Sequence, residues 1–130
     1  MTIMTKSEIR LGRLELQIMN VVWSRGKATV HEVRDELSQG RKPAYSTILT
    51  MMRKLEAKGY LMHEVDGRTY VYQPAISHRA VRRCLLGDLV DRLFEGSPVL
   101  LLTSLVEWNR VTDRELREIQ ELVKKRKAHK

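Results

Sequence analysis

The stretch RKPAYSTILTMMRKLEAKGYLMHEVDGRTYVY, residues 41–72, decides the fold of this chain. Its first half has a helical period over residues 43–58 and ends at a glycine. Two short alternating runs follow, residues 60–65 and 69–72, and Asp66-Gly67 between them is a strong tight-turn signal. A helix followed directly by a hairpin is the layout of a winged helix-turn-helix.

The helix over residues 43–58 has two chemically different faces. At 100° per residue, the residues that share the side of Ile48 are Ala44, Met51, Met52 and Leu55. The opposite side carries Ser46, Thr50, Arg53, Lys54 and Ala57. Residues 41–58 contain five cations and one anion, Glu56. A merely solvated face usually mixes both signs, so the pattern favours a helix that lies in a DNA groove.

Two more predicted helices complete a first domain over residues 1–75. Residues 11–23 form an amphipathic helix that ends at Arg25-Gly26. Thr29 and Glu32 have the spacing of a capping box at the start of a second helix. Arg68 sits beside the hairpin turn, where it is either a phosphate contact or an ordinary exposed arginine.

Three helices are predicted in a second domain, residues 76–130. They cover residues 77–94, residues 98–108, and a last segment that a second capping box, Thr112 with Glu115, begins. Their apolar stripes are wider than so small a layer can bury. We therefore expect a homodimer, with an intrachain bundle as the alternative. The expected dimer residues are Leu85, Leu89, Leu93, Leu101, Leu105, Leu116, Ile119, Leu122 and Val123.

The composition excludes several classes of protein. The net charge of +8 and the pI near 9.9 favour a polyanionic partner. The longest apolar run, residues 99–102, is far shorter than the ~20 residues of a membrane-spanning helix. No signal-peptide pattern is present. With Cys84 as the only cysteine, we expect a reducing bacterial cytoplasm and a buried structural thiol, in preference to a redox sensor.

No catalytic or cofactor motif stands out. The seven glycines form no phosphate-binding loop, and the four histidines have no metal-ligand spacing among themselves or with the cysteine. The sequence therefore predicts neither an enzyme nor a bound cofactor or metal.

Three segments together resemble the penicillinase-repressor family (BlaI/MecI/CopY type). They are LGRLELQIMNVVWSRGKATVHEV at residues 11–33, AYSTILTMMRKLEAKGYL at 44–61 and GRTYVYQP at 67–74, followed by a leucine-rich helical part. The resemblance extends over about residues 10–125. It implies a mainly α fold with a small β-hairpin wing, a winged helix-turn-helix followed by a C-terminal helical dimerisation region. It further implies a cytoplasmic transcriptional repressor whose dimer binds a palindromic DNA operator.

The resemblance also assigns roles to individual residues. Those that read or approach bases fall on Ser46, Thr47, Thr50 and Lys54. Those that contact the DNA backbone fall on Lys42, Tyr45, Arg53 and Arg68. Thr47 lies at the edge of the polar face inferred from helical spacing, and the other base-reading residues lie on it.

Relatives in this family are often inactivated by a membrane sensor-protease, which cuts the C-terminal part. The corresponding bond here is Ser104-Leu105, although the usual Asn-Phe pair is not kept. The chain ends in KKRKAHK without cysteine, so the copper-controlled branch is disfavoured. From a different functional class, the alternative is a winged-helix adaptor that binds protein rather than specific DNA.

Overall fold

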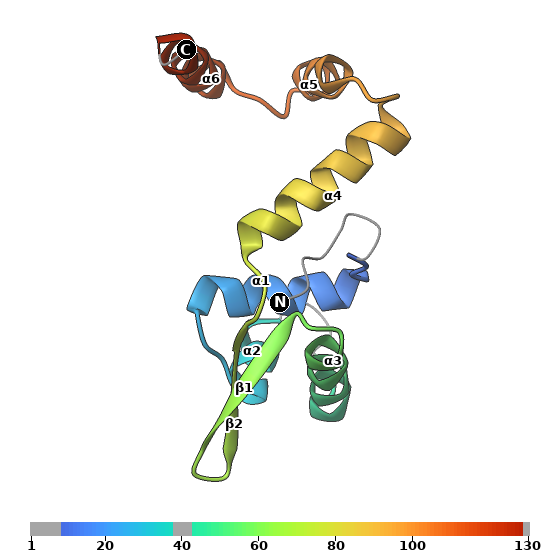
Figure 1. Ribbon diagram of the computed structural model, residues 1–130, viewed down its shortest axis with the longest axis vertical. Helices are drawn as coiled ribbons and strands as arrows, with labels where there is room; N and C mark the ends of the chain where they lie inside the picture. The colour runs from blue at the N-terminus through green and yellow to red at the C-terminus, as the bar shows by residue number, and fades with distance from the viewer. Residues whose placement is uncertain (1–8, 38–42, 129–130) are drawn as a thin grey trace. The chain divides into compact units, whose positions relative to one another are not determined.

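The computed structural model describes residues 9–37 and 43–128 of the chain (Figure 1). The elements are α1 (Arg13–Arg25), α2 (Val30–Glu36), α3 (Tyr45–Ala57), β1 (Leu61–Asp66), β2 (Thr69–Pro74), α4 (His78–Leu93), α5 (Pro98–Glu107) and α6 (Asp113–Ala128). The predicted fold class, mainly α with a hairpin wing, is confirmed. The chain divides into two compact units, Met1–Leu86 and Gly87–Lys130.

Helix ends follow local capping chemistry. The backbone N–H of Glu32 donates to Thr29 Oγ1 at 3.2 Å, and the Thr29 N–H donates to Glu32 Oε1 at 2.9 Å, which confirms the predicted capping box. Gly26 ends α1 with φ of 82°, a backbone conformation that residues with a side chain rarely adopt. This helix begins and ends two residues later than expected. Its end is later because Ser24 and Arg25 continue the helix up to Gly26.

The beginning of α3 differs from the prediction. The helix starts at Tyr45, and Ala44 precedes it as an N-cap residue with extended backbone. Pro43 had been expected in the first turn of this helix, but it lies before the helix begins. The Ala44 side chain had been expected on the buried face, but it is exposed. At the other end, Gly59 adopts φ of 91°, and the N–H of Tyr60 donates to Leu55 O at 2.9 Å.

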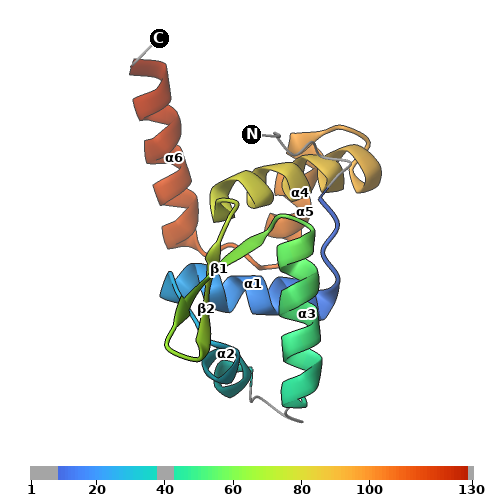
Figure 2. The same cartoon turned by 60° about the horizontal axis from the view of Figure 1, so that its bottom comes forward.

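The core of the first unit lies where α3 meets its neighbours. Helix α3 packs against α1, α2 and β1 (Figure 2). Its buried side chains are Ile48, Met52 and Leu55, whereas Met51 is half-buried. The other fully buried core side chains include Ile18, Met19, Val22, Val33, Tyr60 and Tyr72. This packing holds α3 rigidly while its opposite side stays in solvent.

The hairpin is antiparallel, with Leu61 opposite Pro74 and Asp66 opposite Thr69. The two turn residues are therefore Gly67 and Arg68, one position later than the sequence signal indicated. Gly67 has φ of 65°, as the first central residue of a type II′ turn requires. At its base, the hairpin gains a third partner, because Ala28 and Tyr72 exchange two backbone hydrogen bonds of 2.9 and 2.8 Å.

An ion pair between a buried glutamate and a partly exposed lysine ties α1 to the end of α3. Lys58 Nζ lies 3.0 Å from Glu15 Oε2, and Glu15 Oε1 accepts a hydrogen bond of 3.0 Å from the N–H of Gly12. The Glu15 residue is only 6% exposed. Burial alone would raise the pKa of Glu15, but the bond from Gly12 and the charge of Lys58 outweigh it and leave the pKa lowered.

We expect Glu15→Gln to lower the free energy of unfolding at pH 7 by about 1–3 kcal/mol, since a hydrogen bond to a charged group is lost. Because the folded pKa is below the unfolded one, the stabilisation is present above the ordinary glutamate pKa of about 4.3 and disappears as pH falls through the folded value. Urea denaturation of the wild-type and variant proteins at pH 7 and pH 3.5 measures the difference in their free energies of unfolding at each pH. Glu64→Gln is the control, because its pair with Lys27 is 3.9 Å long and exposed. An equal loss in both variants would contradict the assignment.

The second unit contains the end of α4 together with α5 and α6. Ser97 Oγ accepts a hydrogen bond of 3.1 Å from Leu100 N at the start of α5. Thr112 and Glu115 form the second predicted capping box before α6, with bonds of 2.9 and 3.1 Å. None of the described residues of α5 or α6 is buried. Within residues 9–37 and 43–128, no helix has the length and apolar character to cross a bilayer.

Candidate nucleic-acid interface

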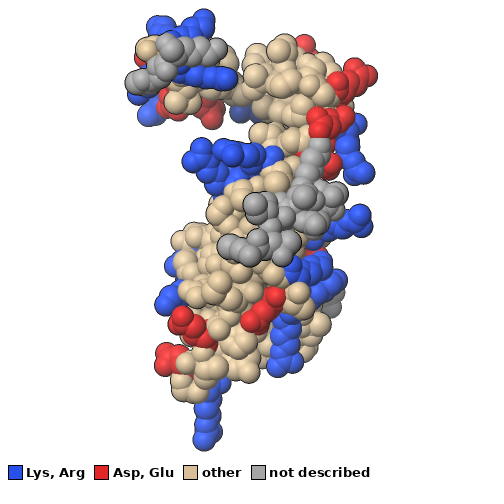
Figure 3. Space-filling view, in the orientation of Figure 1, with Lys and Arg blue, Asp and Glu red and all other residues tan. Residues whose placement is uncertain are grey.

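The outer face of α3 has the composition that its sequence predicts. Ser46, Thr47, Thr50 and Lys54, the expected base-reading residues, are all exposed. Arg53 is exposed beside them. In the part of the chain that the structure describes, neither Arg53 nor Lys54 forms an ion pair, so both positive charges are available to a ligand. Figure 3 shows Lys and Arg gathered over the surface that α3 occupies and at the tip of the hairpin.

The expected backbone-contacting residues that the structure describes are all exposed. Arg68 lies in the exposed hairpin turn. Tyr45, in the first turn of α3, is 39% exposed, and its ring lies 4.6 Å from that of His31 on α2. Lys42 lies outside the described residues.

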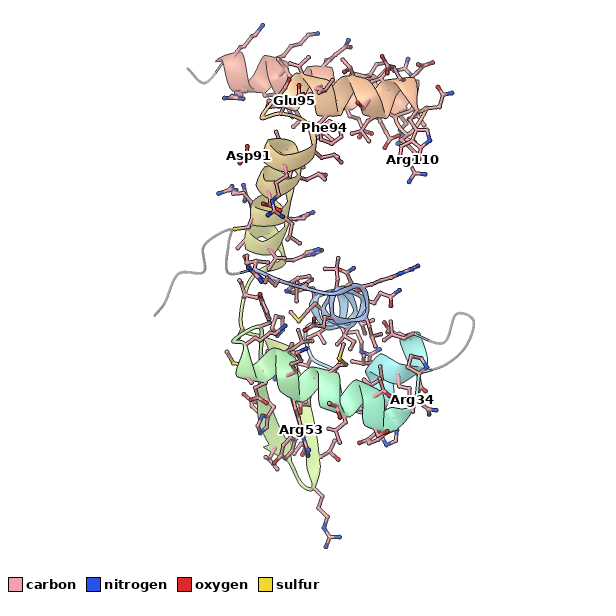
Figure 4. The ribbon with its side chains drawn as sticks, turned by 90° about the vertical axis from the view of Figure 1, so that its right-hand side faces the viewer. Arg34, Arg53, Asp91, Phe94, Glu95 and Arg110 are labelled. Carbon is pink, nitrogen blue, oxygen red and sulfur yellow. The ribbon has the colours of Figure 1, made fainter. Side chains whose placement is uncertain are left out.

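A side-chain contact fixes the entry into α3. Arg34 on α2 donates from Nε to the carbonyl oxygen of Pro43 at 2.9 Å. Figure 4 shows Arg34 on α2 and Arg53 on α3. The bond is partly buried and ties the segment that leads into α3 to α2. Arg34 was not among the residues that the sequence analysis singled out, because its partner is a backbone carbonyl nine residues away.

A second contact that sequence reasoning missed joins α3 to the hairpin. His63 Nδ1 on β1 lies 2.6 and 2.8 Å from the two carboxylate oxygens of Glu56 on α3. The His63 ring stacks on Tyr70 of β2 at 4.1 Å and 9°. The one signal in the sequence was strand alternation, which places His63 on the same face of β1 as Leu61. It did not identify the partner on α3.

Tyr72 lies beneath this contact, with its side chain fully buried. Its hydroxyl has no hydrogen-bond partner among the described residues. Burial raises the pKa of the Tyr72 phenol, and the negative charge of Glu56 raises it further, whereas Arg53 acts in the opposite direction. The junction of α3 and the hairpin therefore contains a carboxylate, an imidazole and two tyrosines.

The residues expected at a dimer interface have substantial exposed surface in the single chain. Leu89, Leu93, Ile119, Leu122 and Val123 are exposed. The remaining four, Leu85, Leu101, Leu105 and Leu116, are half-buried. Several large apolar neighbours are also exposed, including Val99 at 67% and Trp108 at 72%.

The expected cleavage bond Ser104-Leu105 lies inside α5, and both residues are half-buried. Ser104 Oγ donates to Leu100 O at 2.7 Å within the same helix. Cys84 on α4 is half-buried rather than fully buried as expected. The described residues contain no group of three His, Cys, Asp or Glu side chains that could hold a metal ion.

Comparison with known families identifies the chain. The model of the penicillinase repressor family matches residues 11–125. The chain belongs to the penicillinase repressor family. This assignment confirms the resemblance drawn from the sequence motifs, and it makes the chain a member of a family of transcriptional repressors rather than of enzymes.

Curated relatives span most of the chain. The penicillinase repressor of Bacillus licheniformis is 28% identical over 121 residues, covering 93% of this chain and 94% of that protein. The transcriptional regulator BlaI of Mycobacterium tuberculosis is 38% identical over 103 residues, covering 75% and 72%. Among solved structures, a mutant MarR from E. coli complexed with operator DNA is similar in fold, with a TM-score of 0.53, 15% identity and coverage of 92% and 78%.

Proposed function

We propose that this member of the penicillinase repressor family is a DNA-binding repressor that acts as a homodimer on a palindromic operator in the bacterial cytoplasm. The observation that carries the proposal is the outer face of α3, where hydroxyls and two cations lie exposed on a helix whose other side is packed in the core. These cations, Arg53 and Lys54, form no ion pair with the residues that the structure describes. The B. licheniformis relative, named a penicillinase repressor, supports the same function.

Base readout is assigned to Ser46, Thr47, Thr50 and Lys54. A Ser or Thr hydroxyl donates or accepts a hydrogen bond at a base edge, and a Thr methyl contacts a thymine methyl. Lys54 suits the acceptor pair of a guanine. Lys42, Tyr45, Arg53 and Arg68 are assigned to the DNA backbone, where they add salt-dependent affinity and orientation without reading sequence.

Dimerisation is assigned to the second domain, residues 76–130, and DNA binding to the first, residues 1–75. In a two-fold symmetric dimer the two copies of α3 would lie ~34–36 Å apart, one turn of DNA, and read two half-sites. The exposed leucines of α4 and α6 support this division, because a second copy would remove their surface from water.

We further propose that a membrane sensor-protease cuts the repressor and so releases it from DNA. A cut at Ser104-Leu105 would separate α6 from the DNA-binding module and so weaken the dimer. Because the bond lies in helical backbone, the protease would act on a locally unwound α5. Incubation with the sensor's protease domain, followed by mass spectrometry, tests this route. Intact α5 after derepression would contradict it.

Lys54→Ala is expected to weaken binding to operator DNA by about 1–3 kcal/mol and binding to random DNA little, because a base contact is lost. Arg68→Ala should weaken both and reduce the salt slope by about one, because a phosphate contact is lost. Fluorescence anisotropy at two salt concentrations measures these changes. Equal losses on both DNAs for Lys54→Ala would move that residue to a backbone role.

The direct test of the function is an anisotropy titration of the purified protein against the DNA upstream of its own gene and a scrambled duplex. Preference for the upstream DNA that persists at higher salt supports a sequence-specific repressor. Absence of binding to either duplex would contradict the proposal and favour the adaptor alternative.

A further inference from the structure

We propose that Glu56 and His63 form a proton-dependent link between α3 and the hairpin, and that DNA binding by this chain takes up a proton at His63. This inference rests on the function proposed above. It deepens that function by making the affinity of the α3–hairpin surface depend on pH.

The geometry brings the two groups into direct contact. Both carboxylate oxygens of Glu56 lie within 2.8 Å of a single ring nitrogen of His63. Stacking on Tyr70 at 4.1 Å holds the imidazole in this orientation. The side chains are about one-quarter to one-third exposed, 27% for His63 and 32% for Glu56, so protons and salt reach them. Protonation of the ring therefore converts a hydrogen bond to a carboxylate into an ion pair in place.

The position of Glu56 gives this change a consequence for DNA. It is the only acidic residue of α3, whose solvent side is otherwise neutral or cationic. Glu56 lies at the edge between the buried side and the outer face, about 80° round the helix from Ile48. From there its charge still repels the phosphates of DNA bound to α3, and a protonated His63 cancels that charge. Binding should therefore favour the protonated form, which by linkage means that affinity falls as pH rises.

Glu56 is the acidic group in contact with His63. The other charged and titratable groups near the ring are basic, are tyrosines, or lie on the opposite face of the strand. From α3, Arg53 lies one turn before Glu56. From β2, the rings of Tyr70 and Tyr72 face His63, at 4.1 and 5.7 Å between centroids. On its own strand, Glu64 and Asp66 alternate to the opposite face, where Glu64 lies 3.9 Å from Lys27.

Glu56 is in the last turn of α3 and His63 is near the base of β1, so the pair lies between the proposed base-reading helix and the hairpin that carries Arg68. The net charge of the pair therefore acts on both proposed DNA contacts. His63 acts through the charge of Glu56 and not on the bases.

The experiment is an anisotropy titration with the upstream duplex at pH 6.0 and pH 8.0, at low salt. The wild-type affinity is expected to be about three- to tenfold lower at pH 8.0, because histidine changes charge in this interval. His63→Gln should bind weakly at both pH values, because Glu56 stays uncompensated. Glu56→Gln should bind strongly at both, because the repelling charge is gone.

His31→Gln is the matched control, since His31 also lies against a tyrosine, Tyr45 of α3. It should keep the wild-type pH dependence. If it abolishes that dependence, or if both His63→Gln and Glu56→Gln weaken binding equally while the dependence persists, the inference is overturned. Thermal unfolding of each variant checks that it is folded.

A measurement on the wild-type protein alone avoids any folding defect in the variants. Calorimetric titration with DNA at pH 7 in two buffers of different ionisation enthalpy gives the number of protons taken up on binding. Uptake of a fraction of a proton, lost in 0.5 M salt, supports the link. Tight binding with no uptake overturns the inference but leaves the proposed function intact, whereas no binding at either pH refutes the proposed function itself.

Discussion

Replacing Ile119 and Leu122 with lysine is expected to convert the protein to a monomer and to lower its operator affinity about 10²–10⁴-fold. In the single chain these side chains are 41% and 65% exposed, so the substitutions should cost little intrachain stability. In the proposed dimer they would place two charges in an apolar interface. Once the dimer is lost, the second half-site must be bound as a separate event rather than at high effective concentration.

Sedimentation velocity measures the oligomeric state, and anisotropy with the upstream duplex measures affinity. The control variant, Glu118→Gln with Glu121→Gln, changes the net charge by the same amount but on other positions of α6. Its ion pairs, with Arg114 and Lys124, are exposed and contribute little. A double-lysine variant that remains dimeric would refute the assignment of this face to the interface. A monomer with full affinity would refute the need for a dimer.

Ile48→Ala is expected to lower the free energy of unfolding of the first unit by about 2–5 kcal/mol. Ile48 is fully buried on α3, at the centre of the core that α1 and α2 share with it. The substitution removes apolar contacts and leaves a cavity that the rigid neighbours cannot fill. Urea denaturation followed by far-UV circular dichroism measures the loss.

Thr47→Ala, the adjacent residue, is the matched control. Thr47 is exposed, so its removal should change stability by no more than about 0.5 kcal/mol. Under the proposed function, it should instead weaken operator binding. Comparable destabilisation by the two substitutions would mean that α3 is not packed through Ile48.

Much of the fold was predictable because it depends on local chemistry. The Thr29–Glu32 and Thr112–Glu115 capping boxes act over three residues, and Gly67 provides the turn conformation within a two-residue loop. The exposed face of α3 followed from helical spacing alone. The errors were also local. Ala44 has the right angular position for the core, but it precedes the helix and cannot share its buried face.

Contacts between distant residues were not predictable in this way. Lys58 was counted with the basic residues of α3, yet it is paired with Glu15, 43 positions earlier. The link between Glu56 and His63 depends on the angle at which the hairpin leaves α3. Neither pairing has a spacing signature, since the chain between the partners does not determine their separation.

The sequence by itself determined the order of the elements, the hydroxyl and cationic face of α3 and the family to which the chain belongs. These properties depend on periodicity, turn residues and motif order, all of which act along the chain. Only the tertiary structure decided which charges of the α3 region have a partner: Lys58 lies against Glu15 and Glu56 against His63, whereas Arg53 and Lys54 form no ion pair with any residue that the structure describes. The physical reason is that a charge interacts through space, and folding alone determines which opposite charge comes within a few ångströms of it.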